Sequence, residues 1–384
     1  MSAGQSSATL EQPRRTLTVS WDELIRPDLA PLVPYAPGLR ASQVRERSGK
    51  DVVLKLSSNE HPCGPVPIAM AAMREVLPRM NRYSDGGCTA LRRKLSERFS
   101  VPAESVVVGN GSNEILRLLA QVVLRPGDEV VFAWPSFVVY PMVTAIFGAT
   151  GVKVPLAEGD VLDLDAMLAA ITPKTRLVFL CNPNNPTGTI YTKADFERFL
   201  AAVPSHVLTV IDEAYFEFVT DSEYPDGLDY FDGERPIVIA RTFSKIYSLA
   251  GLRVGYAICP PKLAEALHKV REPFNVNTVA QVAAYYSLDD EAEVRRRRKE
   301  NQEQKTYLYS CFDRLGIQYA RSETNFVYFH TSQPVEVFQA LLEEGVIVRD
   351  FGNAPALRLG IGTPEDTQMT IAAFDVIAAR LGKI

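Results

Sequence analysis

Two residues in this chain are placed for chemistry that few other side chains can perform. Lys245 stands in the segment TFSKIYSLAGLR (242–253), in a polar break after an apolar run. Asp212 opens the segment DEAYFEF, directly after the apolar run VLTVI. A lysine amine made neutral by burial or a cationic neighbour can bind an aldehyde covalently and carry a proton. A carboxylate can stabilise a protonated ring nitrogen. Taken alone, the lysine could equally lie in an exposed loop, and the aspartate could cap a helix.

Two further motifs are suited to binding a ligand. The segment GNGSNE (109–114) opens a predicted helix at Ser112, and backbone N–H groups at a helix N-terminus attract anions such as phosphate. It is not a dinucleotide-binding fingerprint, because Glu114 stands where the third glycine would be. The segment NPNNPTG (182–188) predicts a turn, in which Asn185 could also bind a ligand.

The elements that must position these motifs are short apolar runs alternating with amphipathic patterns. Strands are expected at 105–109, 129–133, 176–181, 207–211, 236–241 and 253–258, and helices at 112–123, 163–171 and 193–202. This alternation predicts an α/β fold, with a mostly parallel sheet covered by helices on both faces. Ligands bind such sheets at the carboxyl ends of the strands, where the motifs stand.

The pattern changes beyond residue 270. A long charged helix (about 289–314) precedes strands at 325–329, 346–350 and 357–361 and helices at 334–344 and 364–381. We therefore expect a large domain over 51–270 and a smaller α+β domain over 271–384, with the N-terminal segment 1–50 packing against the smaller one.

Composition and charge exclude several classes of protein. The 384 residues carry a net charge of −5, which opposes binding to nucleic acid or a membrane surface. The five cysteines and four histidines show no metal-ligand spacing, so no metal site is predicted. Residues 1–20 are polar and lack the apolar core of a secretory signal, which indicates a cytoplasmic protein. The uncharged stretch 130–152 is broken by prolines and glycines, and indicates buried interior rather than a membrane span.

A run of basic residues occupies 295–299 in the predicted long helix. It could be a nucleic-acid patch or a solvated helix face. Glu291 and Glu293 stand four residues before Arg295 and Arg297, which favours ion pairs along a solvated face.

The four motifs, in this order, resemble the cofactor-binding segments of the fold-type-I pyridoxal-phosphate-dependent aminotransferases, most closely the histidinol-phosphate aminotransferase family. The resemblance extends from about residue 35 to residue 363. It implies pyridoxal 5′-phosphate as cofactor and transfer of an amino group from histidinol phosphate to 2-oxoglutarate, a step of histidine biosynthesis. Aromatic-amino-acid transamination, decarboxylation on the same scaffold and a non-catalytic cofactor-binding regulator stay open as alternatives.

The resemblance also implies roles around the cofactor ring. Lys245 matches the lysine that binds the cofactor, and Asp212 the carboxylate that pairs with the pyridine nitrogen. Tyr215 and Asn185 match residues that hydrogen-bond the phenolic oxygen. Phe137, in WPSFVVY, matches the aromatic residue that stacks on the ring, where the family often has tyrosine.

Other matches concern the phosphate of the cofactor. Ser112, Asn113, Ser244 and Arg253 match its ligands within one chain. Tyr83, in MNRYSD, matches the tyrosine that reaches the phosphate of the neighbouring subunit. The resemblance therefore implies a homodimer.

Substrate recognition is expected from Tyr35, Asn59, Arg349 and Arg358, again by resemblance. Arg358 in ALRLGIGT matches the arginine that clamps a carboxylate, and a planar guanidinium suits that task better than lysine. Arg349 and Tyr35 match residues near the substrate phosphate. The chain between Arg349 and Arg358 is shorter than the family pattern, and LGIGT departs from it, which bears on phosphate recognition.

Overall fold

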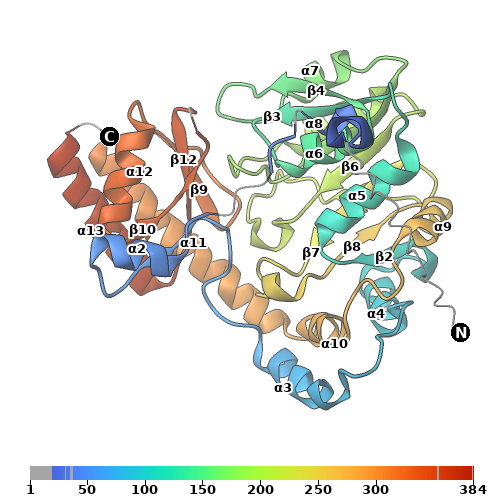
Figure 1. Cartoon of the computed structure of the whole chain (residues 1–384), viewed down its shortest axis with the longest axis horizontal. Coiled ribbons are helices and arrows are strands. Elements are labelled where there is room, and N and C mark those ends of the chain that lie inside the picture. The colour runs from blue at the N-terminus through green and yellow to red at the C-terminus, as the bar shows by residue number, and fades with distance from the viewer. Residues whose placement is uncertain (1–19, 31, 35–37, 353, 383) are drawn as a thin grey trace, which may run out of the picture.

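A seven-stranded sheet forms the centre of the computed structural model, which describes residues 20–30, 32–34, 38–352, 354–382 and 384. Its strands lie in the order β2-β8-β7-β6-β5-β3-β4 (Figure 1). Their bounds are β2 Val106–Gly109, β3 Glu129–Trp134, β4 Thr150–Pro155, β5 Thr175–Cys181, β6 Leu208–Asp212, β7 Ile237–Thr242 and β8 Gly255–Ile258.

The sheet is mostly parallel, as predicted, because β4, β3, β5, β6 and β7 run in the same direction. β8 differs from the fully parallel arrangement, since it pairs antiparallel with both β7 and β2. Only residues 243–254 join β7 to β8, and they hold a single turn of 3₁₀ helix at Ala250–Leu252. Parallel returns are usually made through an α-helix that crosses a face of the sheet, and this connection holds none, in keeping with the antiparallel direction of β8.

Helices cover both faces of this sheet. One face packs on α5 Ser112–Val123, α6 Val139–Ile146 and α9 Pro261–Val270. The other shares its cores with α4 Thr89–Phe99, α7 Leu164–Ala169, α8 Lys193–Ala202 and α10 Thr278–Ser287, and α3 Pro67–Val76 packs against α10. Alternate strand residues point to opposite faces, so Val130 and Phe132 contribute to one core and Val131 and Ala133 to the other.

A second body lies beside the large sheet (Figure 1). It contains the three-stranded sheet β11-β12-β9 and a two-stranded pair of β1 and β10, packed on α11, α12 and α13. The bounds are β1 Leu54–Lys55, β9 Phe326–His330, β10 Val346–Ile347, β11 Arg349–Asp350, β12 Ala356–Gly360, α11 Glu291–Leu315, α12 Pro334–Glu343 and α13 Pro364–Leu381. The domain boundaries at residues 50 and 270 stay a prediction.

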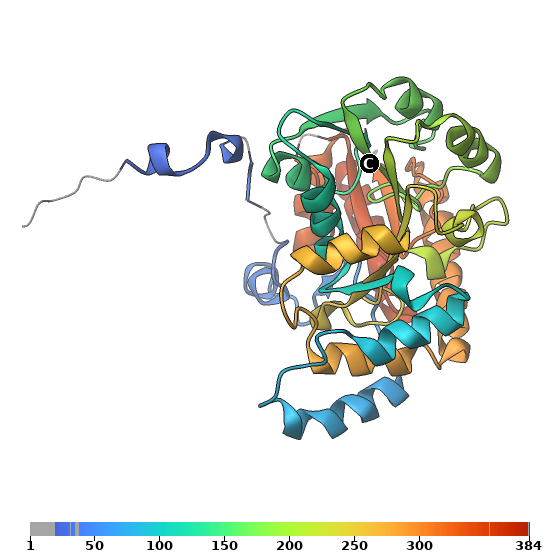
Figure 2. The same ribbon diagram turned by 90° about the vertical axis from the view of Figure 1, so that its right-hand side faces the viewer.

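The N-terminal segment touches both bodies. Helix α2, Ala41–Ser48, packs its buried Val44 against Leu342 and Ile347 of the second body. Residues 20–30 hold the short helices α1 Trp21–Leu24 and η1 Pro27–Leu29. η1 contacts α6, and Arg26 Nη2 donates to the Ile146 carbonyl at the end of that helix, while α1 projects outward (Figure 2). In the described part of the chain, no helix has the length and apolar character needed to cross a membrane.

Candidate active site

Three central parallel strands end at the same edge of the large sheet, and a predicted motif stands at each end. β5 ends at Cys181, β6 at Asp212 and β7 at Thr242. Cys181 is the register partner of Asp212, and Asp212 that of Ala240. The segments NPNNPTG, DEAYFEF and TFSKIYSLAGLR therefore begin side by side, at the edge where sheets of this kind bind ligands.

Lys245 lies three residues beyond the end of β7 and keeps partial contact with solvent. Its Nζ lies 5.4 Å from the centre of the Tyr215 ring. Burial, followed by the positive charges of Arg358 and Arg253, lowers the pKa of its amine to about 8, although nearby carboxylates oppose the shift. A lysine with such a pKa exchanges protons readily near neutral pH.

Asp212 is 1% exposed, and only one of its oxygens is bound by another side chain. The Tyr140 hydroxyl donates a hydrogen bond to Oδ2 over 2.9 Å, whereas Oδ1 accepts none from the described residues. Burial raises the pKa of this carboxyl to about 6, while the Tyr140 hydrogen bond and the Lys245 charge act in the opposite direction. A buried oxygen without a donor is uncommon and indicates a place for a ligand N–H.

Tyr140 is a site residue that the sequence reasoning missed. It lies in the first turn of α6, is buried, and stacks on Phe179 with ring centres 4.5 Å apart. Phe137, which was predicted, is half-buried and meets the Tyr140 ring edge-to-face at 5.7 Å. The signal was present in WPSFVVY, because residues three apart at the start of a helix share a face.

Asn59 and Tyr215 are brought together from distant parts of the sequence. Asn59 Nδ2 donates to the Tyr215 hydroxyl over 2.8 Å, and both side chains are buried. The Asn59 backbone is left-handed, with φ of 56°, and its carbonyl accepts from Asn325 Nδ2 over 3.0 Å. Burial raises the pKa of the Tyr215 phenol well above its usual range, so the neutral hydroxyl is available to donate.

The first turn of α5 forms a cradle for an anion together with Ser244 and Arg253. Gly111 caps the helix with φ of 78° and no side-chain bond, so the N–H groups that begin at Ser112 lack a capping partner. A Cβ on Gly111 would lie 2.5 Å from Arg253 Nη2. Arg253 Nη1 also donates to Ser244 Oγ over 3.3 Å. Asn113, in the same turn, is exposed.

Arg358 links the second body to this edge of the large sheet. Its Nη1 donates to Asn185 Oδ1, and its Nη2 donates to the Ser57 carbonyl over 2.7 Å. Arg349 lies on β11 as the register partner of Arg358 on β12. Residues paired in this way project to the same face, so the short segment between the two arginines brings both to one side of the sheet.

Two predicted site residues are not placed there. Tyr83 is 84% exposed and stacks on Phe274, with ring centres 4.6 Å apart. It borders a surface hollow that Arg79, Asn81 and residues of α10 also line. Tyr35 lies outside the described residues.

The basic run at 295–299 is not the uniformly solvated face that was predicted. Arg295 and Lys299 are exposed and pair with carboxylates on α11, as expected. Arg297, by contrast, is 3% exposed, and Arg298 Nε donates to the Glu217 carbonyl. Ion-pair spacing along a helix does not reveal which face meets the rest of the protein.

Comparison with known proteins agrees with this geometry. The profile of the family described as "Aminotransferase class I and II" matches residues 51–374. A histidinol-phosphate aminotransferase from Moorella thermoacetica is 47% identical over 90% of this chain and 91% of its own length. The crystal structure of histidinol-phosphate aminotransferase from Sinorhizobium meliloti in complex with pyridoxal-5′-phosphate is 25% identical, with a TM-score of 0.85 over 93% of this chain and 98% of that one. An aspartate aminotransferase from Thermus thermophilus with maleate is 26% identical, with a TM-score of 0.79 over 92% and 99%.

Proposed function

This chain belongs to the class I and II aminotransferases, enzymes that use pyridoxal phosphate, and from that premise we propose that it transfers the amino group of histidinol phosphate to 2-oxoglutarate. The assignment to this family rests on the match of its family model to residues 51–374. The substrate is supported by the identity of 47% to a histidinol-phosphate aminotransferase over nearly the full length of both chains.

The residues present fit the cofactor. Oδ1 of the buried Asp212 accepts no hydrogen bond from the described residues. The protonated pyridine nitrogen of the cofactor would supply the missing donor. Its phosphate fits the cradle of Ser112, Ser244 and Arg253, where Gly111 leaves no Cβ in the way. Lys245 offers an amine with a pKa near 8 for the aldehyde.

When bound, pyridoxal phosphate supplies an aldehyde carbon for the amino group and a ring that withdraws electrons. In our proposal, Asp212 keeps the ring nitrogen protonated, and Tyr140 keeps Asp212 ionised and oriented. Tyr215 and Asn185 hydrogen-bond the phenolic oxygen, and Phe137 packs against the ring. Lys245 would take the proton from the substrate carbon that bears the amino group and deliver it to the carbon that was the aldehyde of the cofactor, a role that a pKa near 8 favours.

Arg349 and Arg358 support a substrate that carries an anionic group. One site must accept histidinol phosphate in one half of the reaction and the dicarboxylate 2-oxoglutarate in the other. Two guanidinium groups that start from partnered positions on β11 and β12 offer donors to either anion. Asn59 holds Tyr215 beside them. Tyr35 joins this set in the proposal by its sequence match alone.

We further infer a homodimer in which Tyr83 serves the site of the second subunit. Tyr83 is 84% exposed, although its ring stacks on Phe274 of the same chain. Phe274, which Tyr83 contacts, is 46% exposed. Leu77 and Met80, which precede Tyr83 closely in the sequence, are 55% and 40% exposed. Exposed apolar side chains that gather in this way indicate a protein interface.

The test is a panel of amino donors with 2-oxoglutarate, comparing histidinol phosphate, phenylalanine, tyrosine and aspartate. Phenylalanine lacks the phosphate and would lose two charge-assisted hydrogen bonds. Its kcat/KM should therefore be about 10²- to 10⁴-fold lower than that of histidinol phosphate, which corresponds to roughly 3–6 kcal/mol in transition-state free energy. The reaction should be followed through the visible absorption of the cofactor as well as the product. Equal or higher kcat/KM with phenylalanine would replace our proposal with aromatic transamination, and carbon dioxide release would indicate decarboxylation.

A further inference from the structure

Four buried polar side chains lie along one face of α11 at intervals of four residues. They are Arg297, Asn301, Lys305 and Tyr309, and each is at most 7% exposed. Residues four apart in a helix lie above one another, so they form a single stripe. Buried polar groups need partners, and the partners of this stripe are loops around the active site.

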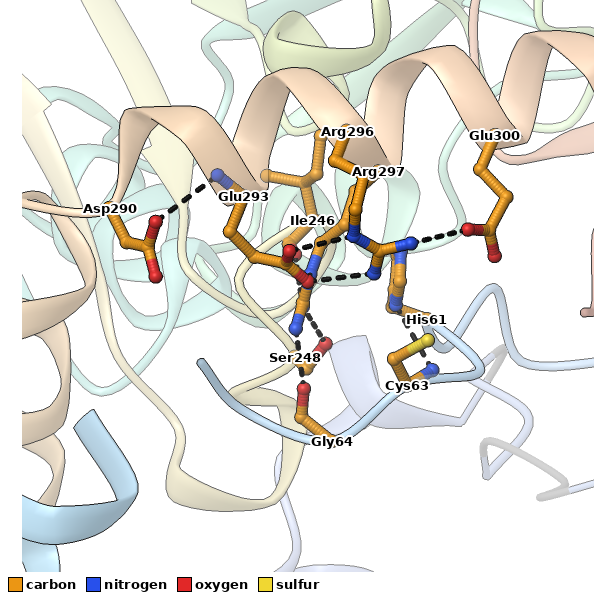
Figure 3. Close-up of polar contacts among 10 residues, drawn as sticks. All are labelled: His61, Cys63, Gly64, Ile246, Ser248, Asp290, Glu293, Arg296, Arg297 and Glu300. Carbon is orange, nitrogen blue, oxygen red and sulfur yellow. Dashed lines mark hydrogen bonds and ion pairs between the residues drawn. The ribbon is translucent and has the colours of Figure 1, made fainter. Parts of the chain in front are cut away.

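Arg297 contacts two of these loops at once (Figure 3). Its Nη1 donates to the Ile246 carbonyl over 2.8 Å and to Ser248 Oγ over 2.6 Å, in the lysine loop, residues 245–248. Its Nη2 donates to the Gly64 carbonyl over 2.7 Å, in the asparagine loop, residues 57–64. Its Nε donates to Glu293 over 2.8 Å, which supplies the opposite charge.

The rest of the stripe reinforces the asparagine loop from the other side. Asn301 Nδ2 donates to the Thr324 carbonyl over 3.0 Å, and the Tyr309 hydroxyl accepts from the Ser322 N–H over 3.0 Å. These bonds hold the segment 322–325, in which Asn325 Nδ2 donates to the carbonyl of Asn59. Helix α11 therefore reaches the Asn59 backbone by two routes.

Each loop contains a residue with a positive φ, and the one in the lysine loop is strained. Ser248 has φ of 60° and Asn59 has φ of 56°, both in the left-handed region. Serine disfavours this region, whereas asparagine adopts it more readily than most residues other than glycine. The Ser248 N–H bonds to the Lys245 carbonyl over 2.9 Å, so the strained residue closes the turn that carries the lysine. Such conformations persist where surrounding contacts hold them, and they concentrate at functional sites.

We propose that Arg297 is a positioning residue, which fixes the lysine loop and the asparagine loop relative to each other from the buried face of α11. The inference rests on the proposed role of Lys245. It adds a residue that contacts neither cofactor nor substrate but sets where the Lys245 amine and the Asn59 amide stand. A guanidinium suits this task because its planar fork serves acceptors in several fixed directions, which an ammonium does not.

The test compares Arg297→Met with Arg295→Met in the purified, cofactor-loaded protein. Arg295 is a matched control, because it belongs to the same run of arginines but pairs with Glu291 at the exposed surface. The pH midpoint of the visible absorption of the bound cofactor should rise by about 0.5 unit or more in Arg297→Met, since a loosened turn admits water around Lys245. The charged groups nearest the amine, Arg358, Glu60, Arg253 and Asp212, are the same in both variants.

Turnover should change together with this midpoint. We expect kcat in Arg297→Met to fall about 100-fold, because small displacements of a reacting group have effects of that order. Arg297→Lys should lie between Arg297→Met and wild type, and Arg295→Met should match wild type in both measurements. A lower melting temperature with an unchanged midpoint and unchanged kcat would overturn the proposal and leave Arg297 a purely structural residue.

A second set of variants keeps the test decisive if Arg297→Met fails to fold. Ser248→Ala removes one acceptor and should raise the midpoint in the same direction by less. Ser248→Gly adopts the left-handed turn without strain, so in the Arg297→Lys background it should restore part of the shift. No shift in Ser248→Ala, or no rescue by Ser248→Gly, would overturn the proposal. Wild-type protein without visible absorption would instead reject the function proposed for Lys245.

Discussion

Burial shifts the two central ionisable residues in opposite directions. It raises the pKa of the Asp212 carboxyl to about 6 and lowers the pKa of the Lys245 amine to about 8. Each shift favours the neutral form, so the cofactor-free site holds two groups that titrate on either side of neutral pH. Such paired shifts are typical of functional sites and unfavourable for stability.

Lys245→Met should stabilise the cofactor-free protein at pH 7. The pKa of Lys245 falls from its ordinary value of 10.5 to about 8 on folding, which corresponds to at most about 3 kcal/mol. Below pH 8 the amine is protonated in both states, and the folded state carries the full penalty of burying the charge. The penalty declines between pH 8 and 10.5 and is absent above, where the amine is neutral in both states.

Urea unfolding of cofactor-free wild type and Lys245→Met between pH 7 and 10 measures this effect. The advantage of the variant in free energy of unfolding should shrink as the pH rises. Lys299→Met, at an exposed position of α11, is the control and should show no such trend. A constant difference between wild type and Lys245→Met across this range would contradict the low pKa.

Tyr140→Phe should weaken cofactor binding most at acidic pH. The Tyr140 hydroxyl stabilises the ionised form of Asp212, so its loss raises the pKa of that carboxyl further and reduces its ionised fraction. We expect affinity for pyridoxal phosphate to fall by about 1–3 kcal/mol at pH 6 and by less at pH 9. Tyr307→Phe, at a residue 65% exposed, is the control. An equal loss at both pH values would mean that Tyr140 acts through packing alone.

The sequence was informative about residues next to motifs and silent about contacts made across the fold. Lys245, Asp212, Ser244 and Arg253 stand inside patterned segments, and the structure brings them to one edge of the sheet. The buried position of Arg297 depends on which face of α11 meets the loops of the site. No local pattern specifies that choice, because the neighbouring glutamates suit a solvated face equally well.

At the scale of elements, helix α5 contributes to the proposed phosphate site through its first turn. Gly111 caps it with a positive φ of 78° and an extended ψ of 164°, a combination open almost only to glycine, and Arg253 lies close to where a Cβ would be. Gly111→Ala should therefore raise the dissociation constant of pyridoxal phosphate more than about tenfold, since the added methyl would displace the guanidinium that binds the phosphate in our proposal. It should also lower the free energy of unfolding by about 1–3 kcal/mol through backbone strain.

Gly127→Ala separates these two effects. Gly127 also has a positive φ, of 91°, but nothing lies within 4 Å of a Cβ built on it. The control should therefore lose stability like Gly111→Ala and bind pyridoxal phosphate like wild type. Equilibrium binding to the two cofactor-free variants decides the matter. Equal affinities would show that the cradle tolerates a methyl group and that Gly111 serves only the turn.

Elements with a strong apolar period were predicted close to their observed bounds, and those defined by tertiary context were not. β5 and α8 match the expected ranges within a residue or two, because buried strands and capped amphipathic helices are encoded locally. The reversed direction of β8 goes with a connection after β7 that holds no α-helix, and is not encoded by the apolar pattern of the strand itself. α3 and α10, which pack against each other, were not predicted.

At the scale of the molecule, the site is assembled from two bodies. The large sheet supplies Asp212 and Lys245, and the second body supplies Arg358, which reaches the Ser57 carbonyl and Asn185. The site is thus held by contacts between segments up to 301 positions apart in the sequence. Sequence patterns identify the segments that take part in such contacts, but they do not show that these segments meet. Nor do they show which surface a second chain would cover.

Tyr83 tests whether that second chain completes the site. We expect Tyr83→Ala and Lys245→Ala homodimers each to have low activity, the first through weaker phosphate binding and the second through loss of the amine. In a mixed dimer, the site with an intact Lys245 receives an intact Tyr83 from the other chain, and the second site lacks both. If the subunits are unfolded together and refolded at equal ratio, half of the dimers are mixed, so activity should recover to about a quarter of wild type. A tyrosine that acts within its own chain would give no recovery, because neither site of the mixed dimer would then be intact.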